Sequence, residues 1–372
     1  MNILVLGGGI VGEGIAFALR NEHQVTVADH SEQRLLYLKK RYGIEGKKVD
    51  AAKDDLSALM KNYDIVAGSL PGRLGMKVIR EACKAGVNLV DNSFMEEDYY
   101  SLEKDVRDCN ILVVPDSGVA PGLSNIIVGR IASEYEYLED VDIKVGGLPE
   151  RNIPPLGYKV VFSPLDTLDE YTRKVVILKN WEVTEAEPGD GLEYFFVNNL
   201  GSMEAFYTNG LRSLIRNIRA KNMGEKTIRF RGHLEKIKLL REMGLLDEEK
   251  ITVNNISISP KEMLASLLLK KLSFPDVPDI LYMEIKVTPK GGEDQINYKV
   301  FDRADKNTGI SAMARTTGFT NASIVNLIAK GRIKETGIIA PEIIAKSREN
   351  FEDITKFLRN LGVEVSQPSI RK

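Results

Sequence analysis

The chain has 372 residues, 43% of them hydrophobic and 28% charged, which is an ordinary composition for a globular protein and a length that predicts two domains. The formal net charge of -2 excludes a nucleic-acid or anionic-membrane partner held by bulk electrostatics, and no apolar run approaches the roughly 20 residues that span a bilayer. Cys83 and Cys109 are too few for a disulfide framework or a four-thiolate metal site, so we expect a cytoplasmic protein that acts on a small molecule.

Short apolar runs alternate with amphipathic stretches through the first part of the chain. Apolar runs of strand length occur at residues 2–9, 24–29, 63–72, 87–93 and 110–118. Residues 31–43 and 75–86 between them have helical periodicity. Runs of this kind predict βα units around a parallel sheet that is buried on both faces, which is a doubly wound α/β domain.

The first strand ends in a glycine-rich turn that opens a helix. Gly7, Gly9 and Gly12 form a G-x-G-x-x-G pattern, with Ile10 and Val11 between the last two. Such a turn lets the backbone approach a pyrophosphate at the helix N-terminus, and the third glycine permits close packing of helix and strand. The pattern predicts a dinucleotide site formed by these five residues, against the alternative of a turn built from glycines for steric reasons alone.

An acid ends the second strand, where the ribose of a dinucleotide would lie. Asp29 follows Gly12 by about 17 residues, near the usual separation for a ribose-binding acid. Its carboxylate would accept hydrogen bonds from a ribose diol and repel a 2′-phosphate. We therefore expect NAD rather than NADP, although His30 and Arg34 could instead receive the phosphate.

Other residues of the predicted cofactor site follow the next strands. Asp50 is predicted beside the adenine or, equally, as a helix N-cap. Leu70 and Pro71 are expected to line the path toward the nicotinamide, since ligands bind outside the carboxyl ends of parallel strands.

Three polar side chains end the last two apolar runs of this domain. Asp91 and Ser93 follow one run and Asp116 the next, so all three should point toward the same crevice. An acid beside the nicotinamide can bind a cationic amine or accept its proton, which makes Asp116 a candidate catalytic residue and Ser93 a candidate substrate ligand. The competing interpretation is that Asp116 forms an Asx turn.

The rhythm of the sequence changes near Asn125, where we place a domain boundary. Residues 125–135 predict a longer helix, and helical patterns return at residues 233–244 and 311–333. Closely spaced, alternating strands indicate a mostly antiparallel sheet with a few helices, so the second domain is expected to be α+β. Its strand-like segments are at residues 137–149, 158–164, 174–183, 192–199 and 280–302.

The second domain contributes candidate substrate ligands where strands meet turns. Arg212 and Arg229 have the planar fork that clamps a carboxylate, and Glu170 with Tyr171 could recognise an α-amino group. His233 could act as an acid, a base or a hydrogen-bond donor, and its structural alternative is a buried histidine. No histidine and carboxylate cluster has metal-ligand spacing, so no metal is expected.

Several motifs together resemble the saccharopine dehydrogenase-like family, and look closest to its short members that act as L-lysine 6-dehydrogenases. The motifs are LGGGIVG, VPDSGVAPGLSN, SPLDTLDEYTR, NGLRS, RFRGHLEKIKLLREMG and AMARTTGFTNASI. The resemblance implies a Rossmann domain of residues 1–125 completed by residues 312–372. It also implies a substrate-binding and dimerisation domain of residues 126–311, and a homodimer.

The resemblance implies a reaction as well. NAD-dependent oxidative deamination of the ε-amine of L-lysine would give ammonia and 2-aminoadipate 6-semialdehyde, which cyclises to piperideine-6-carboxylate. Asp116 and His233 would serve in proton transfer and amine positioning, while Arg212 and Arg229 would hold the α-carboxylate. Two alternatives stay open: a saccharopine reductase or carboxynorspermidine dehydrogenase acting on a secondary amine, and a non-catalytic NAD-binding sensor.

Overall fold

The computed structural model describes residues 1–160, 163–292 and 294–371, and the chain divides into two compact units. The first unit joins Met1–Glu136 to Asp305–Ser366, and the second joins Tyr137–Ala304 to the residues from Gln367 onward. The segment near the C-terminus that the family resemblance assigned to the first domain therefore lies in the first unit, except for its last residues.

The predicted domain boundary at residue 125 falls inside a helix, α6 (Leu123–Ala132), and the first unit keeps this whole helix. A Cβ on Gly129 of α6 would lie only 2.3 Å from the carbonyl oxygen of Glu342, which belongs to α12 (Pro341–Ile344). The close backbone contact holds α6 in the first unit, so the chain leaves that unit after Glu136.

The first unit is built on a parallel sheet whose seven described strands have the order β17-β6-β5-β4-β1-β2-β3. The strands are β1 (Asn2–Leu6), β2 (Gln24–Asp29), β3 (Glu45–Lys48), β4 (Ile65–Gly68), β5 (Asn88–Asp91), β6 (Leu112–Val114) and β17 (Gly337–Ile338). The other helices are α1 (Ile10–Leu19), α2 (Glu32–Tyr42), α3 (Leu56–Met60), α4 (Gly75–Ala85), α5 (Glu103–Asp108), α11 (Ala312–Ala329) and α13 (Arg348–Asn360), with 3-10 turns η1 (Gly72–Leu74) and η2 (Tyr99–Leu102).

The predicted doubly wound parallel sheet is confirmed, and each of the five predicted apolar runs contains one strand. Two strands were not predicted. β3 has the sequence EGKK and is exposed along its whole length at the edge of the sheet, so it lacks the apolar signal of a buried strand. β17 has only two residues.

Local sequence explains where these helices begin and end. The Ser31 hydroxyl accepts a hydrogen bond from the Arg34 N–H and caps α2, and Gly43 ends that helix with a φ of 70°, in the left-handed region that glycine adopts freely. Ser311 caps α11 in the same way, by accepting from the Ala314 N–H at 3.1 Å.

Helices α1 and α11 cross at close range inside the first unit, although they come from opposite ends of the sequence. A Cβ on Gly14 would lie 2.2 Å from the Ala314 carbonyl oxygen, and one on Gly318 would lie 2.8 Å from the Val11 carbonyl oxygen. Phe319 and Ile324 of α11 are completely buried. The helix from the C-terminal segment is therefore part of the core on which the dinucleotide-binding motif rests.

The second unit is built on a mixed, mostly antiparallel sheet of nine described strands. Its central path is β10-β11-β12-β7-β15-β16-β18, with only β12 and β7 parallel, and β8 and β9 lie off this path. The strands are β7 (Leu138–Pro149), β8 (Val175–Lys179), β9 (Glu182–Ala186), β10 (Glu193–Val197), β11 (Gly201–Tyr207), β12 (Ala220–Phe230), β15 (Asp279–Pro289), β16 (Gln295–Arg303) and β18 (Ser369–Arg371).

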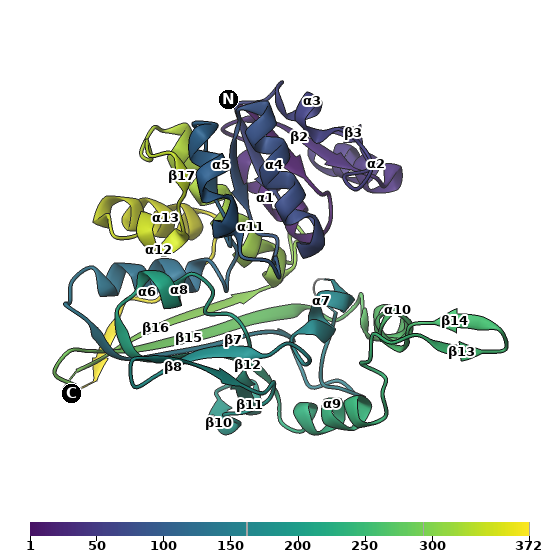
Figure 1. Ribbon diagram of the computed structural model, residues 1–372, viewed down its shortest axis with the longest axis vertical. Helices are drawn as coiled ribbons and strands as arrows, with labels where there is room; N and C mark the ends of the chain where they lie inside the picture. The colour runs from purple at the N-terminus through teal and green to yellow at the C-terminus, as the bar shows by residue number, and fades with distance from the viewer. Residues whose placement is uncertain (161–162, 293, 372) are drawn as a thin grey trace. The chain divides into compact units, whose positions relative to one another are not determined.

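Four helices and a separate hairpin complete the described part of the second unit. The helices are α7 (Pro164–Asp169), α8 (Leu214–Asn217), α9 (His233–Glu242) and α10 (Pro260–Leu272). Strands β13 (Ile251–Val253) and β14 (Ile256–Ile258) form a hairpin that stands beyond α10, away from the sheet (Figure 1).

The predicted α+β character of this unit is confirmed, but β11, β12 and the β13-β14 hairpin lie outside the predicted strand segments. Residues 158–160 of the predicted strand 158–164 are not in a strand, and residues 161–162, like residue 293 within the predicted segment 280–302, lie outside the described residues. Among the described helices, none is long and apolar enough to cross a membrane.

We predict that Gly14→Ala or Gly318→Ala destabilises the first unit. The added methyl group meets backbone atoms of the other helix, which cannot move aside cheaply, so the free energy of unfolding should fall by about 2 kcal/mol. Urea denaturation followed by circular dichroism measures this change. Gly9→Ala is the matched control, because its Cβ meets nothing within 4 Å; equal stability of all three variants would contradict the prediction.

Candidate active site

The glycine-rich turn forms an open cradle at the start of α1. A Cβ on Gly12 would lie 1.8 Å from the Gly7 carbonyl oxygen, so only glycine allows this approach of helix to strand. At Gly9 a Cβ would meet nothing within 4 Å, and the next residue, Ile10, is exposed while Val11 is half-buried. Open space at a helix N-terminus favours an anion, so the turn fits the pyrophosphate of a dinucleotide, which would supply the hydride acceptor when bound.

Asp29 ends β2, and its carboxylate holds the glycine-rich turn in place. One oxygen accepts the Gly8 N–H at 2.7 Å, and the other accepts the Ser31 N–H at 2.7 Å. Each oxygen keeps a further lone pair that a ribose hydroxyl could use. The structure therefore places the predicted ribose-binding acid beside the cradle and gives it a second, structural task.

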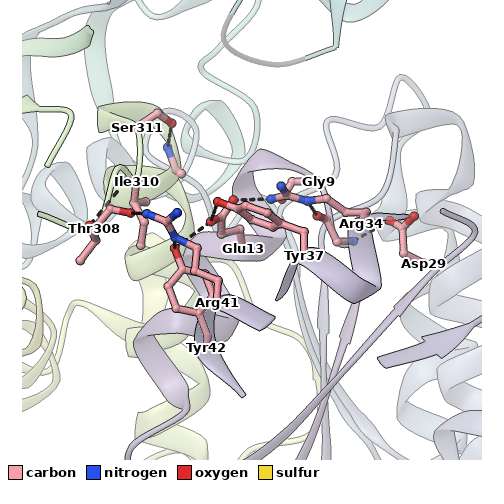
Figure 2. Close-up of polar contacts among 12 residues, drawn as sticks. Gly9, Glu13, Asp29, Arg34, Tyr37, Arg41, Tyr42, Thr308, Ile310 and Ser311 are labelled. Carbon is pink, nitrogen blue, oxygen red and sulfur yellow. Dashed lines mark hydrogen bonds and ion pairs between the residues drawn. The ribbon is translucent and has the colours of Figure 1, made fainter. Parts of the chain in front are cut away.

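Arg34, the predicted alternative partner of a 2′-phosphate, is held by the protein itself (Figure 2). Its guanidinium contacts the carbonyl oxygens of Gly8 and Gly9 and forms an ion pair with Glu13. It also lies over the ring of Tyr37, 4.7 Å from the ring centroid. Because Glu13 neutralises the guanidinium, Arg34 presents little net charge to a phosphate at this edge of the site.

Glu13 belongs to a hydrogen-bonded network that connects the edge of the glycine-rich turn to the C-terminal segment (Figure 2). The hydroxyls of Tyr37 and Tyr42 donate to Glu13 Oε1 at 3.2 Å and 2.8 Å. Arg41 Nε donates to the Tyr42 hydroxyl at 2.9 Å, and the Arg41 guanidinium contacts the Thr308 carbonyl oxygen. Sequence reasoning missed this network, because nothing in the spacing relates residues so far apart.

Asp50 lies in the turn that follows β3 and is not at the N-terminus of a helix. Its carboxylate accepts the Ala52 N–H at 3.1 Å and pairs with Lys53 at 3.1 Å. The N-cap of α3 is Asp55, which accepts from the Ser57 N–H at 2.9 Å. The interpretation of Asp50 as a helix cap is therefore wrong, and its placement beside an adenine stays a prediction.

Ser93 connects the ends of β4 and β5. Its hydroxyl oxygen lies 2.9 Å from the Leu70 carbonyl oxygen and 2.9 Å from Asp91 Oδ1. Leu70 and Pro71 are half-buried, and Ser93 fixes their backbone at the place predicted for the path to the nicotinamide. Ser93, predicted as a substrate ligand, is thus already engaged in positioning the cofactor-binding segment.

Asp91 and Asp116 place two buried carboxyl groups at neighbouring strand ends. Burial, reinforced by the charge of Asp116, raises the pKa of Asp91 to about 6 despite hydrogen bonds from Ser93. The Tyr99 hydroxyl donates to Asp116 Oδ2 at 2.8 Å. The structure therefore brings the three predicted strand-end residues together, and adds Tyr99, which the sequence gave no reason to select.

The backbone at Asp116 has an uncommon conformation. Its φ of 50° lies in the left-handed region, which aspartate tolerates better than most residues. The next residue, Ser117, donates its N–H to the Asp91 carbonyl oxygen at 2.9 Å, so the sharp turn is fixed on both sides. An acid at this position therefore suits the turn.

Arg229 is the centre of the polar cluster in the second unit. Its side chain is only 3% exposed. Nε donates to the Tyr171 hydroxyl at 3.2 Å, one terminal nitrogen donates to Glu170 Oε2 at 2.8 Å, and the other donates to the Ile228 carbonyl oxygen at 3.0 Å. The ring of Tyr158 lies under the guanidinium, 5.0 Å from its carbon. The structure thus joins three of the predicted substrate ligands.

His233 extends this cluster in a fixed protonation state. Nδ1 lies 2.8 Å from the Leu156 carbonyl oxygen, which can only accept, so Nδ1 carries the hydrogen. Nε2 then accepts the Tyr171 hydroxyl at 2.8 Å. Burial, followed by the charge of Arg229, lowers the pKa of His233 to about 3, so the ring stays neutral at physiological pH. This geometry favours a positioning role for His233 over the predicted proton transfer.

The remaining predicted arginine, Arg212, lies in the turn before α8. Its φ of 51° is again in the left-handed region, which indicates a constrained backbone at this position. Arg216 and Arg219, on the segment that follows, are exposed, and the guanidinium of Arg219 lies over the rings of Tyr137 and Trp181.

Glu225 is a further buried acid that sequence reasoning missed. It lies on β12 with Thr227 and Arg229 at alternate positions, so the three side chains share one face of the sheet. No strand was predicted over residues 220–230, so the sequence reasoning had no common face on which to group these residues. Among the described residues, no group of histidine, cysteine and carboxylate side chains is arranged to hold a metal ion.

Comparison with known families covers nearly the whole chain. Residues 3–114 match the model of the saccharopine dehydrogenase NADP binding domain, and residues 118–363 match that of the saccharopine dehydrogenase C-terminal domain. The chain is also 24% identical over 452 residues to the mitochondrial alpha-aminoadipic semialdehyde synthase of Rattus norvegicus, an alignment that covers 100% of this chain and 48% of the relative. It thus spans about half the length of that relative.

Two comparisons with Saccharomyces cerevisiae agree over almost full lengths. Its saccharopine dehydrogenase [NADP(+), L-glutamate-forming] is 23% identical, with 91% of this chain and 93% of the yeast protein covered. The structure of the apo histidine-tagged saccharopine dehydrogenase (L-Glu forming) has the same fold, with a TM-score of 0.80, 20% sequence identity and 100% coverage of both chains. Since both halves of the chain match the models of one family, the protein belongs to the saccharopine dehydrogenase family.

Proposed function

We propose that the protein is an NAD-dependent dehydrogenase that oxidises the ε-amine of L-lysine to 2-aminoadipate 6-semialdehyde and ammonia. The observation that carries this proposal is the Arg229 cluster. A guanidinium has five N–H groups, and the described residues accept from three of those of Arg229. One hydrogen remains on each terminal nitrogen, so Arg229 keeps two donors for the carboxylate of a ligand.

The surroundings of Arg229 suit an amino acid rather than a simple acid. Glu170 lies beside the guanidinium and is half-buried, so it can face the α-amino group of a ligand whose carboxylate Arg229 holds. Tyr171 and His233 fix the orientation of the guanidinium through Nε. Family membership supports an amino-acid substrate, since the relatives are named for saccharopine and for alpha-aminoadipic semialdehyde.

The proposed reaction removes a hydride from the ε-carbon and a proton from the ε-nitrogen of lysine, which gives an imine. The glycine-rich turn would hold NAD, which would supply the hydride acceptor when bound. Asp116 is proposed to take the proton, because it is the acid at the strand end next to the predicted nicotinamide position. Water then adds to the imine carbon and ammonia leaves. The α-amine of the semialdehyde attacks the aldehyde carbon, and loss of water closes the cyclic imine piperideine-6-carboxylate. His233 is proposed to position Tyr171 and Arg229 without changing its own protonation state.

The first alternative is that the substrate is saccharopine or carboxynorspermidine, in which the reacting nitrogen is a secondary amine. The names of the yeast relatives favour saccharopine. The second alternative is a sensor that binds NAD without turnover. A panel of amines, assayed with NAD and with NADP, separates all three.

We predict that NADH forms from NAD in the presence of L-lysine and not of saccharopine or carboxynorspermidine, and that Asp116→Asn lowers kcat by about 10²- to 10⁴-fold. The magnitude is that of a lost proton acceptor. Absorbance of the reduced cofactor measures the rate, and thermal melting checks that the variant is folded. Asp64→Asn, which changes an exposed acid of the same unit, is the control. NADPH formed with saccharopine would establish the first alternative, and NAD binding without reduction by any amine the second.

The choice of NAD over NADP rests on the residues beside the glycine-rich turn that Figure 2 shows. Asp29 keeps a negative charge beside the glycine-rich turn, and Arg34 is neutralised by Glu13. Both features disfavour a 2′-phosphate. The matching family model and the yeast relative carry NADP in their names, so this proposal departs from them.

We predict that the protein binds NADH at least about tenfold more tightly than NADPH, and that Asp29→Ser reduces this ratio by removing the repulsive charge. Titration of the fluorescence of each reduced cofactor gives both dissociation constants. Glu32→Gln is the control, because it removes an exposed acid only three residues away. Equal affinities of the wild-type protein for the two cofactors would contradict the assignment.

We also propose that the protein is a homodimer, with the β13-β14 hairpin in the interface. Opposed residues of an antiparallel pair share a face, so Ile251, Val253, Ile256 and Ile258 form one apolar face. Ile251, Val253 and Ile256 are 50%, 45% and 63% exposed. An isolated two-stranded hairpin is marginally stable in water, so this face needs a cover, and a second copy of the chain would supply one.

We predict that Ile256→Asp shifts the protein from dimer to monomer, because it places a charge on the apolar face. Size-exclusion chromatography with light scattering measures the mass. Thr252→Asp is the matched control, since Thr252 lies on the other face of the same hairpin. A monomeric wild-type protein, or an Ile256→Asp variant that remains dimeric, would argue against this interface.

A further inference from the structure

Strand β12 carries three buried polar side chains on one face, and the first of them is an acid without a cationic partner. Glu225, Thr227 and Arg229 alternate along the strand and are 4%, 6% and 3% exposed. Arg229 is paired with Glu170 at 2.8 Å. Within the described part of the chain, no ion pair includes Glu225, whose carboxylate accepts a hydrogen bond from the Thr208 hydroxyl.

The hydrogen bonds around Glu225 are directed toward it. The Thr208 hydroxyl donates to Glu225 Oε2 at 2.8 Å and lies 2.8 Å from the Thr227 hydroxyl. Because Thr208 has a single hydroxyl hydrogen, Thr227 must be the donor in the second contact. The chain from Thr227 through Thr208 to Glu225 therefore suits a carboxylate that becomes ionised.

The charges of the cluster are unbalanced when Glu225 is ionised. Burial, with the nearby charge of Glu170, raises the pKa of Glu225 to about 8, although Thr208 and the charge of Arg229 act in the opposite direction. On the neighbouring strand β7 the residue in register with Glu225 is the apolar Ile143, which offers no countercharge. Two carboxylates then face one guanidinium, and the site lacks one positive charge.

We propose that Glu225 is a specificity-determining residue of the amino-acid site, whose carboxylate selects substrates with a net positive charge. This inference rests on the proposed function, since it assumes that the Arg229 cluster binds an amino acid. Lysine carries two ammonium groups and one carboxylate, so it supplies the missing positive charge. Saccharopine carries two amine cations and three carboxylates, and it would bring further negative charge to a buried acidic site.

Glu225 and the ligand are linked through protons. A cation beside Glu225 favours the ionised form, so lysine binding below about pH 8 should release a proton from the protein. The affinity for lysine should therefore rise with pH up to the pKa of Glu225 and level off above it. In the absence of ligand, the raised pKa stabilises the folded protein below its ordinary value of 4.5, and this contribution is lost as the pH rises through about 8.

The test is isothermal titration calorimetry of L-lysine and saccharopine into the full-length protein saturated with NADH, which cannot accept a hydride. For the wild-type protein, we expect the Kd for lysine to fall by about tenfold between pH 6.5 and pH 8.5, with proton release seen as a dependence of the heat on the buffer. Glu225→Gln should bind lysine more weakly at pH 8.5, lose the pH dependence and discriminate less against saccharopine. Its melting temperature should also fall less than that of the wild type between pH 5 and pH 9, which reports on folding separately.

Glu193→Gln is the matched control, because Glu193 belongs to the same sheet but already pairs with Lys144 at 2.9 Å and Lys226 at 2.7 Å. It should leave lysine binding and its pH dependence unchanged. A Glu225→Gln variant with the wild-type pH profile and the wild-type preference for lysine would overturn the inference while the lysine dehydrogenase activity stands. A wild-type protein that neither binds nor oxidises lysine would instead overturn the proposed function, and the inference with it.

Discussion

The buried guanidinium of Arg229 organises the second unit. A cation that is almost completely removed from water is tolerated only when several groups receive its hydrogens and one of them balances its charge. Glu170 supplies the charge, and Tyr171 and a backbone carbonyl oxygen supply further acceptors. Tyr171 must then find an acceptor for its own hydrogen, and it finds His233. Arg229 thus influences which nitrogen of His233 accepts a hydrogen through Tyr171, without a direct hydrogen bond between the arginine and the histidine.

In the first unit, carboxylates at strand ends and in the first turn of α1 accept the hydrogens of nearby N–H and O–H groups. Asp29 binds two backbone N–H groups, and Glu13 receives an arginine and two tyrosines. Each acid shapes the rim of the glycine-rich turn while it satisfies the backbone or side chains around it. Asp91 and Asp116 are less fully compensated, which is why the pKa of Asp91 rises. The side chains that we propose for ligand binding therefore also have structural tasks in both units.

The parts of this molecule that the sequence predicts are those with a local signal. Apolar runs located five strands of the parallel sheet, and the glycine spacing located the turn at the start of α1. The edge strand β3 was not predicted, because its residues are exposed and it lacks an apolar run. The contact of Glu13 with Arg34 is a tertiary contact that leaves no local mark. Proton transfer by His233 was a reasonable expectation from residue type alone, but burial and the Leu156 carbonyl oxygen were not visible in the sequence.

The position of α11 in the core has a consequence for how the protein is made. Helix α1 leaves the ribosome long before α11, yet Ile15 and Leu19 are completely or almost completely buried in a unit that includes α11. The ribosome must synthesise the whole second unit before α11 emerges. Throughout that time the amino-terminal βα units expose apolar surface that only the late helix can cover. The nascent chain is therefore a natural client for chaperones, and a truncated product would be recognised as unfolded.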